Sequence, residues 1–79
     1  MEGFGKYYYS NGEIYEGDFK NGIKEGLGKY FYNNGERYEG YFVGNVREGF
    51  GKIYKNNKEI YRGQFKNDIF IGDINNDKK

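Results

Sequence analysis

The sequence predicts an all-β protein, an elongated single-layer antiparallel β-meander of stacked hairpins with a 23-residue repeat. The first observation is composition: the 79 residues include 14 Gly and 17 Tyr or Phe but no Pro, which favours strands joined by frequent turns. The second is that good helix formers are nearly missing, since the chain has no Ala and one Leu. The third is internal repetition, because shifting the chain by 23 residues aligns 25 of 56 positions identically.

The first hairpin is predicted in residues 5–19, around a turn at residues 10–12. A three-residue loop, with Gly12 in the left-handed position, places Tyr7 opposite Tyr15 and Lys6 opposite Glu16. A two-residue turn would instead place Tyr7 opposite Glu16. The first register separates aromatic from charged side chains and pairs opposite charges, so we prefer it.

The later hairpins follow from the repeat. A six-residue loop, residues 20–25, is expected to lead to the second hairpin, with Phe19 paired to Gly26. Repetition then gives a meander of six strands and a partial seventh. In the third hairpin Lys58 occupies the turn position that Gly12 holds in the first. A positive φ at Lys58 would weaken that hairpin by about 1 kcal/mol.

This register gives the sheet two different faces. On the first, which we call the tyrosine face, an aromatic row lies beside a glycine row and a row that alternates Gly with Phe. The three rows are Tyr7, Tyr15, Tyr30, Tyr38, Ile53, Tyr61; Gly5, Gly17, Gly28, Gly40, Gly51, Gly63; and Gly3, Phe19, Gly26, Phe42, Gly49, Phe65. The glycines leave room for neighbouring rings to lie flat across the sheet, so we expect a small core without a second layer.

The second face, which we call the lysine–glutamate face, carries a charged row. Lys6, Lys29 and Lys52 stand opposite Glu16, Glu39 and Arg62. Exposed Lys–Glu pairs of this kind contribute about 0.2–1 kcal/mol each. We expect residues 1–74 to form one array of about three repeats, partial at both ends, and residues 75–79 to form a polar tail.

Charge and termini limit the classes of partner. The formal net charge is +1 with both signs interspersed, so nucleic-acid binding is not expected. No apolar run approaches the roughly 20 residues of a membrane span, and the first residues do not form a signal peptide. We therefore expect a cytoplasmic chain, and the sequence leaves open a place at the cytoskeleton or the membrane periphery.

Enzyme activity is not expected, because the chain has no His and no Cys. Ser10 lies in a predicted turn with no base to activate it. Glu16 and Glu39 are expected to pair with lysines rather than to act as an acid–base pair. The sequence therefore predicts no cofactor, no metal site and no small-molecule substrate.

Binding is the remaining class of function. An exposed aromatic strip on a one-layer sheet marks an interaction site. The candidate protein-binding residues are Tyr9, Tyr15, Tyr32, Tyr38, Phe42 and Tyr61. The alternative is a phospholipid headgroup site at Lys6, Lys29 and Lys52. Self-association, through the strand edges or by packing of the aromatic faces, is a further expectation.

The repeated unit resembles the MORN motif, the membrane occupation and recognition nexus repeat. Residues 15–22, Tyr-Glu-Gly-Asp-Phe-Lys-Asn-Gly, and residues 26–30, Gly-Leu-Gly-Lys-Tyr, carry the resemblance, which recurs in register over about residues 2–72. Departures from the motif are Gly44-Asn45 and Asn67-Asp68 in place of Asn-Gly, and Lys58. The resemblance implies an open meander of stacked hairpins that acts as a scaffold, binding proteins, dimerising or sitting at membranes, and it supplies no catalytic residues.

Overall fold

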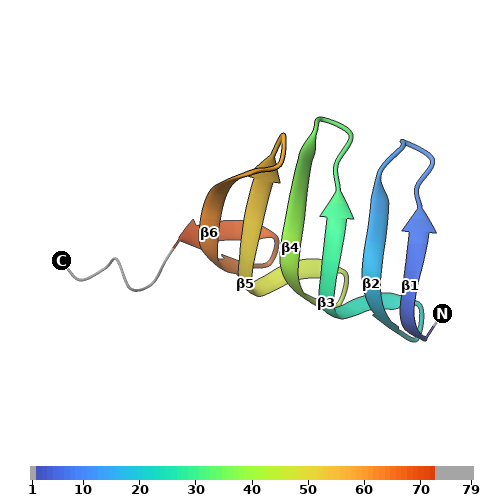
Figure 1. The fold of residues 1–79 in the computed structure, drawn as a ribbon. Helices are drawn as coiled ribbons and strands as arrows, with labels where there is room; N and C mark the ends of the chain where they lie inside the picture. The colour runs from blue at the N-terminus through green and yellow to red at the C-terminus, as the bar shows by residue number, and fades with distance from the viewer. Residues whose placement is uncertain (1, 73–79) are drawn as a thin grey trace.

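The computed structural model describes residues 2–72, which form one open antiparallel sheet of seven strands. The strands lie side by side in the order of the sequence, with the hairpin turns together at one end (Figure 1). Their bounds are β1 Gly3–Tyr8, β2 Ile14–Lys20, β3 Ile23–Phe31, β4 Glu36–Val43, β5 Val46–Lys55, β6 Lys58–Lys66 and β7 Ile69–Gly72. The predicted all-β meander is confirmed.

The register predicted for the first hairpin is also confirmed. Tyr7 pairs with Tyr15 and Lys6 with Glu16. The loop has three residues: the amide of Tyr9 donates to the Glu13 carbonyl at 2.9 Å, and Gly12 has φ +95°. Further along the sheet the aromatic and glycine rows continue without a break from β1 to β6.

The connection between hairpins differs from the prediction. The six-residue loop is in fact a two-residue turn at Asn21-Gly22, with φ of +52° and +78°, and β3 begins at once with Ile23. Phe19 pairs with Lys24 rather than Gly26, because β3 carries a bulge opposite Asp18. Gly26 lies in that bulge with φ +98°, a conformation that favours glycine. The same geometry recurs between β4 and β5 around Gly44-Asn45 and Gly49.

The turn of the third hairpin, which lacks the glycine of the first two, differs from the prediction. Lys58 does not take a positive φ. Instead Asn56 and Asn57 form a two-residue turn with φ of +53° and +67°, and Asn tolerates this region better than other side chains. The turn is one residue shorter than in the first two hairpins, and the extra residue, Ile60, is absorbed in a bulge of β6.

The core is a ladder of aromatic rings on the tyrosine face. Phe19, Tyr15, Phe42, Tyr38 and Phe65 follow one another edge to face, with centroids 5.0–5.1 Å apart and planes at 82–86°. This geometry is favourable for aromatic pairs. All five rings are buried, so a single sheet layer holds a continuous core.

The glycine row makes that core possible. The ring of Tyr15 lies across Gly28, where an added Cβ would stand 2.6 Å from the ring Cζ. Its hydroxyl donates to the carbonyl of Asp18 at 2.9 Å, beside the bulge. Tyr38 repeats this arrangement over Gly51 and donates to Tyr41 at 2.8 Å. The glycines therefore contribute by having no side chain, which leaves room for the tyrosine rings, as the sequence predicted.

Side chains of each repeat also bind the turn of the next repeat. The carboxylates of Glu2, Glu25 and Glu48 accept bonds from the amides of Asn21, Gly44 and Asn67 respectively, at 2.9–3.3 Å. Asn45 Oδ1 accepts from the Lys24 amide, and the Asn45 amide donates back to the Lys24 carbonyl at 3.1 Å. We call these hydrogen bonds between adjacent repeats the clamps, and they hold neighbouring repeats in the 23-residue register. The predicted polar tail, residues 75–79, and the array boundary at 74 lie outside the described residues.

Candidate functional site

The predicted protein-binding residues fall into two groups. Tyr15, Tyr38 and Phe42 belong to the core, and exposed fractions of 0, 0 and 3% leave them no ring surface for a partner. Tyr9 and Tyr32 are half-buried and pack against that core from the hairpin-turn end. Tyr61 is 54% exposed and packs against Phe70 at 5.3 Å. The structure therefore places accessible rings only at the margin of the predicted site.

Tyr9 and Tyr32 belong to a second cluster of rings. Tyr7, Tyr9, Tyr30 and Tyr32 follow each other with centroid distances of 4.7, 5.6 and 4.8 Å. They come from the turn ends of β1 and β3, where the three-residue loops leave the sheet. We call these four residues the tyrosine cluster.

Two cations lie on the tyrosine face that the sequence analysis did not assign to it. Lys24 Nζ donates to the Tyr9 hydroxyl at 2.9 Å and stands 5.4–5.7 Å from the ring centres of Tyr9, Tyr15 and Tyr30. Such distances give cation–π attraction. Sequence reasoning missed Lys24 because it placed the residue in a loop, whereas the two-residue turn makes it a strand residue.

Arg47 is the second cation, one repeat after Lys24. Its guanidinium lies 4.9 Å from the Phe65 ring centre and 5.6 Å from that of Tyr38. Its Nε forms an ion pair with Asp68 at 3.1 Å, and a further nitrogen bonds the Asp68 carbonyl. The 23-residue spacing of Lys24 and Arg47 was the signal in the sequence that these cations share one role.

A hollow of about 290 Å³ opens between the two cations. It is lined by Lys24, Tyr30, Tyr32, Phe42, Asn45, Arg47 and Asp68. Ring surfaces and cationic nitrogens therefore meet in one depression of the tyrosine face, together with the Asp68 carboxylate.

Burial and hydrogen bonding at the same end of the sheet shift several pKa values. The Tyr30 hydroxyl donates to Glu13 at 2.9 Å, and this bond holds the pKa of the Glu13 carboxyl below 4.5. Burial raises the pKa of Tyr15 to about 12, and it also raises the pKa values of Tyr30 and Tyr32. All three hydroxyls therefore stay protonated at neutral pH and can donate hydrogen bonds, which phenolates cannot.

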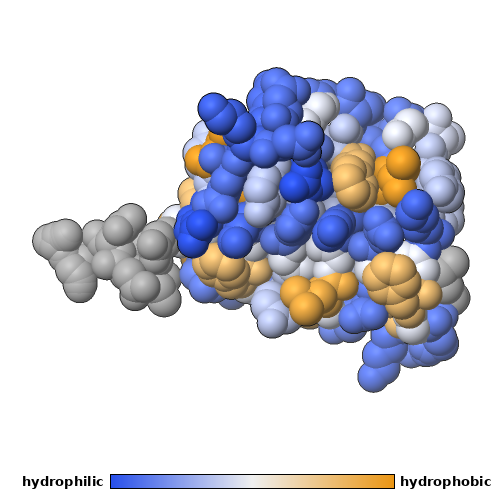
Figure 2. Space-filling view, in the orientation of Figure 1, coloured by the Kyte–Doolittle hydropathy of each residue, from blue (hydrophilic) through white to orange (hydrophobic). Residues whose placement is uncertain are grey.

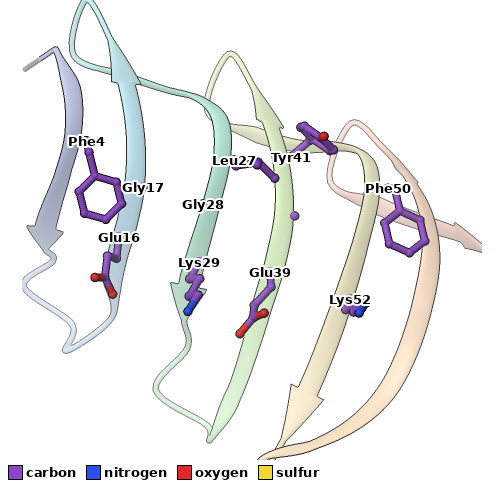
Figure 3. A pocket seen from close by; sticks show the side chains of 11 residues that line it. Phe4, Glu16, Gly17, Leu27, Gly28, Lys29, Glu39, Tyr41, Phe50 and Lys52 are labelled. Atoms are coloured by element: carbon purple, nitrogen blue, oxygen red, sulfur yellow. The ribbon is translucent and has the colours of Figure 1, made fainter.

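The lysine–glutamate face carries a larger depression, of about 540 Å³. Four members of the charged row line it, Glu16, Lys29, Glu39 and Lys52. Four exposed apolar side chains, Phe4, Leu27, Tyr41 and Phe50, complete its walls, with Gly17, Gly28 and Gly40 between them (Figure 3). In surface view, apolar patches lie in two bands with a hydrophilic band between them (Figure 2).

The predicted lipid-headgroup residues lie in that charged row. Lys6, Lys29 and Lys52 alternate along it with Glu16 and Glu39 on intervening strands, as expected. The ion pairs among residues 2–72, however, join Arg37 to Glu39, Arg47 to Asp68 and Arg62 to Glu59. The three lysines are thus separated from one another by carboxylates and do not form a basic patch.

No group of three carboxylates among residues 2–72 is arranged to hold a metal ion. The same range contains no helix long and apolar enough to cross a membrane.

A comparison with models of protein families assigns the repeat to a family, whereas a comparison with curated proteins does not. No curated protein matches the chain. A family model described as MORN repeat matches four successive segments, residues 1–14, 15–37, 38–59 and 61–70. These segments cover nearly all of the seven-stranded sheet and follow its 23-residue register. The chain therefore belongs to the MORN repeat family.

Proposed function

We propose that this chain is a non-catalytic scaffold that binds a protein partner on its tyrosine face. MORN repeats are in general modules that interact with proteins or membranes. For this chain the proposed partner is a protein. The observation that carries it is the position of Lys24 and Arg47 among the tyrosine rings, beside an open hollow.

The chemistry of the surface suits a segment that combines carboxylates with apolar side chains. Two carboxylates of the partner would meet the Lys24 ammonium and the Arg47 guanidinium, one each, in charge-assisted bonds. The two cations are two strands apart, about 9.6 Å. Acidic residues at i and i+7 of a helix lie on one face and are about 10.5 Å apart, close to that distance. Tyr9 and Tyr32 supply rigid ring surface of the kind enriched at protein interfaces.

The lipid alternative has weaker support. Membrane attraction gains about 1 kcal/mol per basic residue near an anionic surface. In the charged row Lys29 stands between Glu16 and Glu39, the cross-strand partners on either side of it. These carboxylates would cancel much of the attraction.

A peptide-display library panned on the wild-type chain tests the protein proposal. We expect enrichment of sequences that carry acidic residues beside aromatic or aliphatic ones. The selected peptides should lose affinity for the Lys24→Glu and Tyr32→Ser variants and keep it for Lys58→Glu, an equal charge change at an exposed residue beside a turn. Equal binding of the selected peptides to wild type and to Lys24→Glu would contradict the proposal.

Vesicle sedimentation tests the lipid alternative. Vesicles with and without phosphoinositide are mixed with the wild-type chain and with Lys6→Glu. Salt-sensitive binding that is lost in Lys6→Glu would replace the protein proposal by the lipid one. The cytoplasmic localisation stays a prediction.

A further inference from the structure

The two cations of the tyrosine face are held by the same backbone geometry. Asn45 Oδ1 accepts from the Lys24 amide at 2.9 Å, and the Asn45 amide donates to the Lys24 carbonyl at 3.1 Å. One repeat later, Asp68 makes the same two bonds with Arg47, at 2.9 and 3.0 Å. Asn45 and Asp68 are 23 residues apart and so occupy equivalent positions of the repeat. Either residue type serves the clamp, because the clamp uses one side-chain oxygen and one backbone amide.

The charge at this equivalent position differs between the two repeats. Asp68 adds an ion pair to the clamp, since its Oδ1 lies 3.1 Å from the Arg47 Nε. Asn45 is neutral, and among residues 2–72 no carboxylate lies within ion-pair distance of Lys24. The Lys24 ammonium instead donates to the Tyr9 hydroxyl at 2.9 Å. One cation of the hollow is therefore open to a carboxylate from outside, whereas the other has its counter-ion within the chain.

We propose that Asp68 is a specificity-determining residue of the partner site, because its carboxylate competes with a carboxylate of the partner for Arg47. This inference rests on the proposed function and adds an inequality between the two cations. At Lys24 a carboxylate of the partner forms a new charge-assisted bond. At Arg47 the same group meets a cation that is already paired, and it approaches the negative charge of Asp68. An acidic residue of the partner should thus contribute much at Lys24 and little at Arg47.

The exposures of the pair fit a competitor that can be displaced. The Asp68 side chain is 50% exposed and that of Arg47 is 23% exposed. Ion pairs that are open to water contribute little to stability, so the fold does not depend on this one. Arg47 also has other contacts, because its guanidinium lies 4.9 Å from the Phe65 ring centre and bonds the Asp68 backbone carbonyl. Removal of the Asp68 charge should therefore free the cation rather than displace it.

The choice between Asn and Asp at this position sets how acidic a partner each repeat accepts. Asn leaves the cation of the clamp open to a carboxylate, whereas Asp supplies a carboxylate from the chain itself. The chain contains both versions, so each test variant copies a residue that the equivalent position already holds. Asp68→Asn copies Asn45, and Asn45→Asp copies Asp68, and both substitutions keep the two clamp bonds.

Parallel selection tests the inference. A peptide-display library is panned on the wild-type chain and on Asp68→Asn, and fluorescence anisotropy measures the affinity of each selected peptide for both chains. Peptides selected on Asp68→Asn should carry more acidic residues and should bind wild type about tenfold more weakly, the effect of one charge-assisted bond. Peptides selected on wild type should bind Asn45→Asp about tenfold more weakly than wild type, because the added carboxylate competes for Lys24.

Two controls separate this competition from other effects. Glu16→Gln removes one negative charge from the lysine–glutamate face, on the opposite side of the sheet, and should leave the affinities unchanged. Hydrogen exchange of the Arg47 amide should be as slow in Asp68→Asn as in wild type, because the asparagine oxygen keeps the clamp. Asn45→Asp adds the carboxylate where Asp68→Asn removes it, so the result does not rest on one variant.

Three results would overturn the inference. Selected peptides that bind wild type, Asp68→Asn and Asn45→Asp equally, yet still lose affinity for Lys24→Glu, would remove the role of Asp68 and leave the proposed function standing. An equal gain of affinity in Glu16→Gln would assign the effect to net charge. No enrichment on either chain would contradict the proposed function together with this inference, so the two failures are distinguishable.

Discussion

The close approach of Tyr38 to Gly51 allows a quantitative test of the core. In the Gly51→Ala variant the new Cβ would stand 2.5 Å from the Tyr38 hydroxyl oxygen and 2.6 Å from the ring Cζ. Real Cβ atoms do not come this close, and Tyr38 is fully buried between Phe42 and Phe65. The ring must therefore move out of its place in the aromatic ladder.

The magnitude follows from two effects. Overpacking of a filled core destabilises by about 1–3 kcal/mol. Displacement of the ring also breaks the bond from the Tyr38 hydroxyl to the Tyr41 carbonyl, which measures 2.8 Å and contributes about 1 kcal/mol. We expect a loss of about 3 kcal/mol in the free energy of unfolding. A chain of this length has roughly 4–12 kcal/mol in total, so the loss is a large fraction.

Urea unfolding followed by circular dichroism measures the change, and a double-mutant cycle identifies its cause. In the Tyr38→Leu background the ring is gone, so Gly51→Ala should become nearly neutral, or stabilising by up to about 0.5–1 kcal/mol, since Gly weakens a strand. The comparison variant is Gly12→Ala, where φ is +95° and no atom lies within 4 Å of the new Cβ. Its loss of about 1 kcal/mol should be the same in both backgrounds.

Either of two outcomes would refute this reasoning. A loss below about 1 kcal/mol for Gly51→Ala would mean that the ring is not held over the glycine. An equal loss with and without the Tyr38 ring would mean that the backbone, rather than the contact, needs glycine at this position.

Three further predictions concern the turns, the clamps and the pH dependence. Asn57→Gly should stabilise the chain by about 0.5–1 kcal/mol in urea unfolding, because position 57 has φ +67° and Asn-Gly is the favoured two-residue hairpin turn; a destabilised variant would contradict the observed turn. Glu25→Gln weakens the bond to the Gly44 amide, 3.1 Å long, so hydrogen exchange of that amide should accelerate while the amide of Asn67, held by Glu48, stays protected; equal acceleration at both would show that the clamp is not local. Tyr15 has its pKa raised from 10.0 to about 12, so the unfolded chain releases this proton first, and the contribution of this hydroxyl to stability should be constant below pH 10 and fall as the pH rises from 10 to about 12. An unfolding midpoint that does not change across that range would contradict the burial of the hydroxyl.

The strand register could be predicted from which side chains would share a face of the sheet. Only one register of the first hairpin puts Tyr7 opposite Tyr15 and Lys6 opposite Glu16, and the repeat then carries that register across the sheet. The role of the glycines followed from the same argument. Physical complementarity across strands was therefore enough to place the aromatic, glycine and charged rows.

The bulges could not be predicted by that argument. The argument from which side chains share a face assumes regular strand pairing, and regular pairing would place Phe19 opposite Gly26. In the structure the positive φ of Gly26 lets β3 accommodate extra residues in a bulge. That error placed Lys24 in a loop and hid its contact with the Tyr9 ring. For the candidate site, burial was the missing quantity: the sequence identifies Tyr15 and Tyr9 as members of one strip, but only the packing shows that the first is core and the second accessible.

The clamps between repeats have a consequence for how such a chain changes length. Each one joins a residue to another 19–21 positions away, so every bond closes within adjacent repeats. A 23-residue unit inserted between Gly22 and Ile23 would therefore meet the same donors and acceptors on both sides. Each inserted unit adds two strands, about 9.6 Å of sheet, and one more nearest-neighbour contribution to stability. Evolution can thus set the length of the binding surface in fixed steps without redesigning any contact.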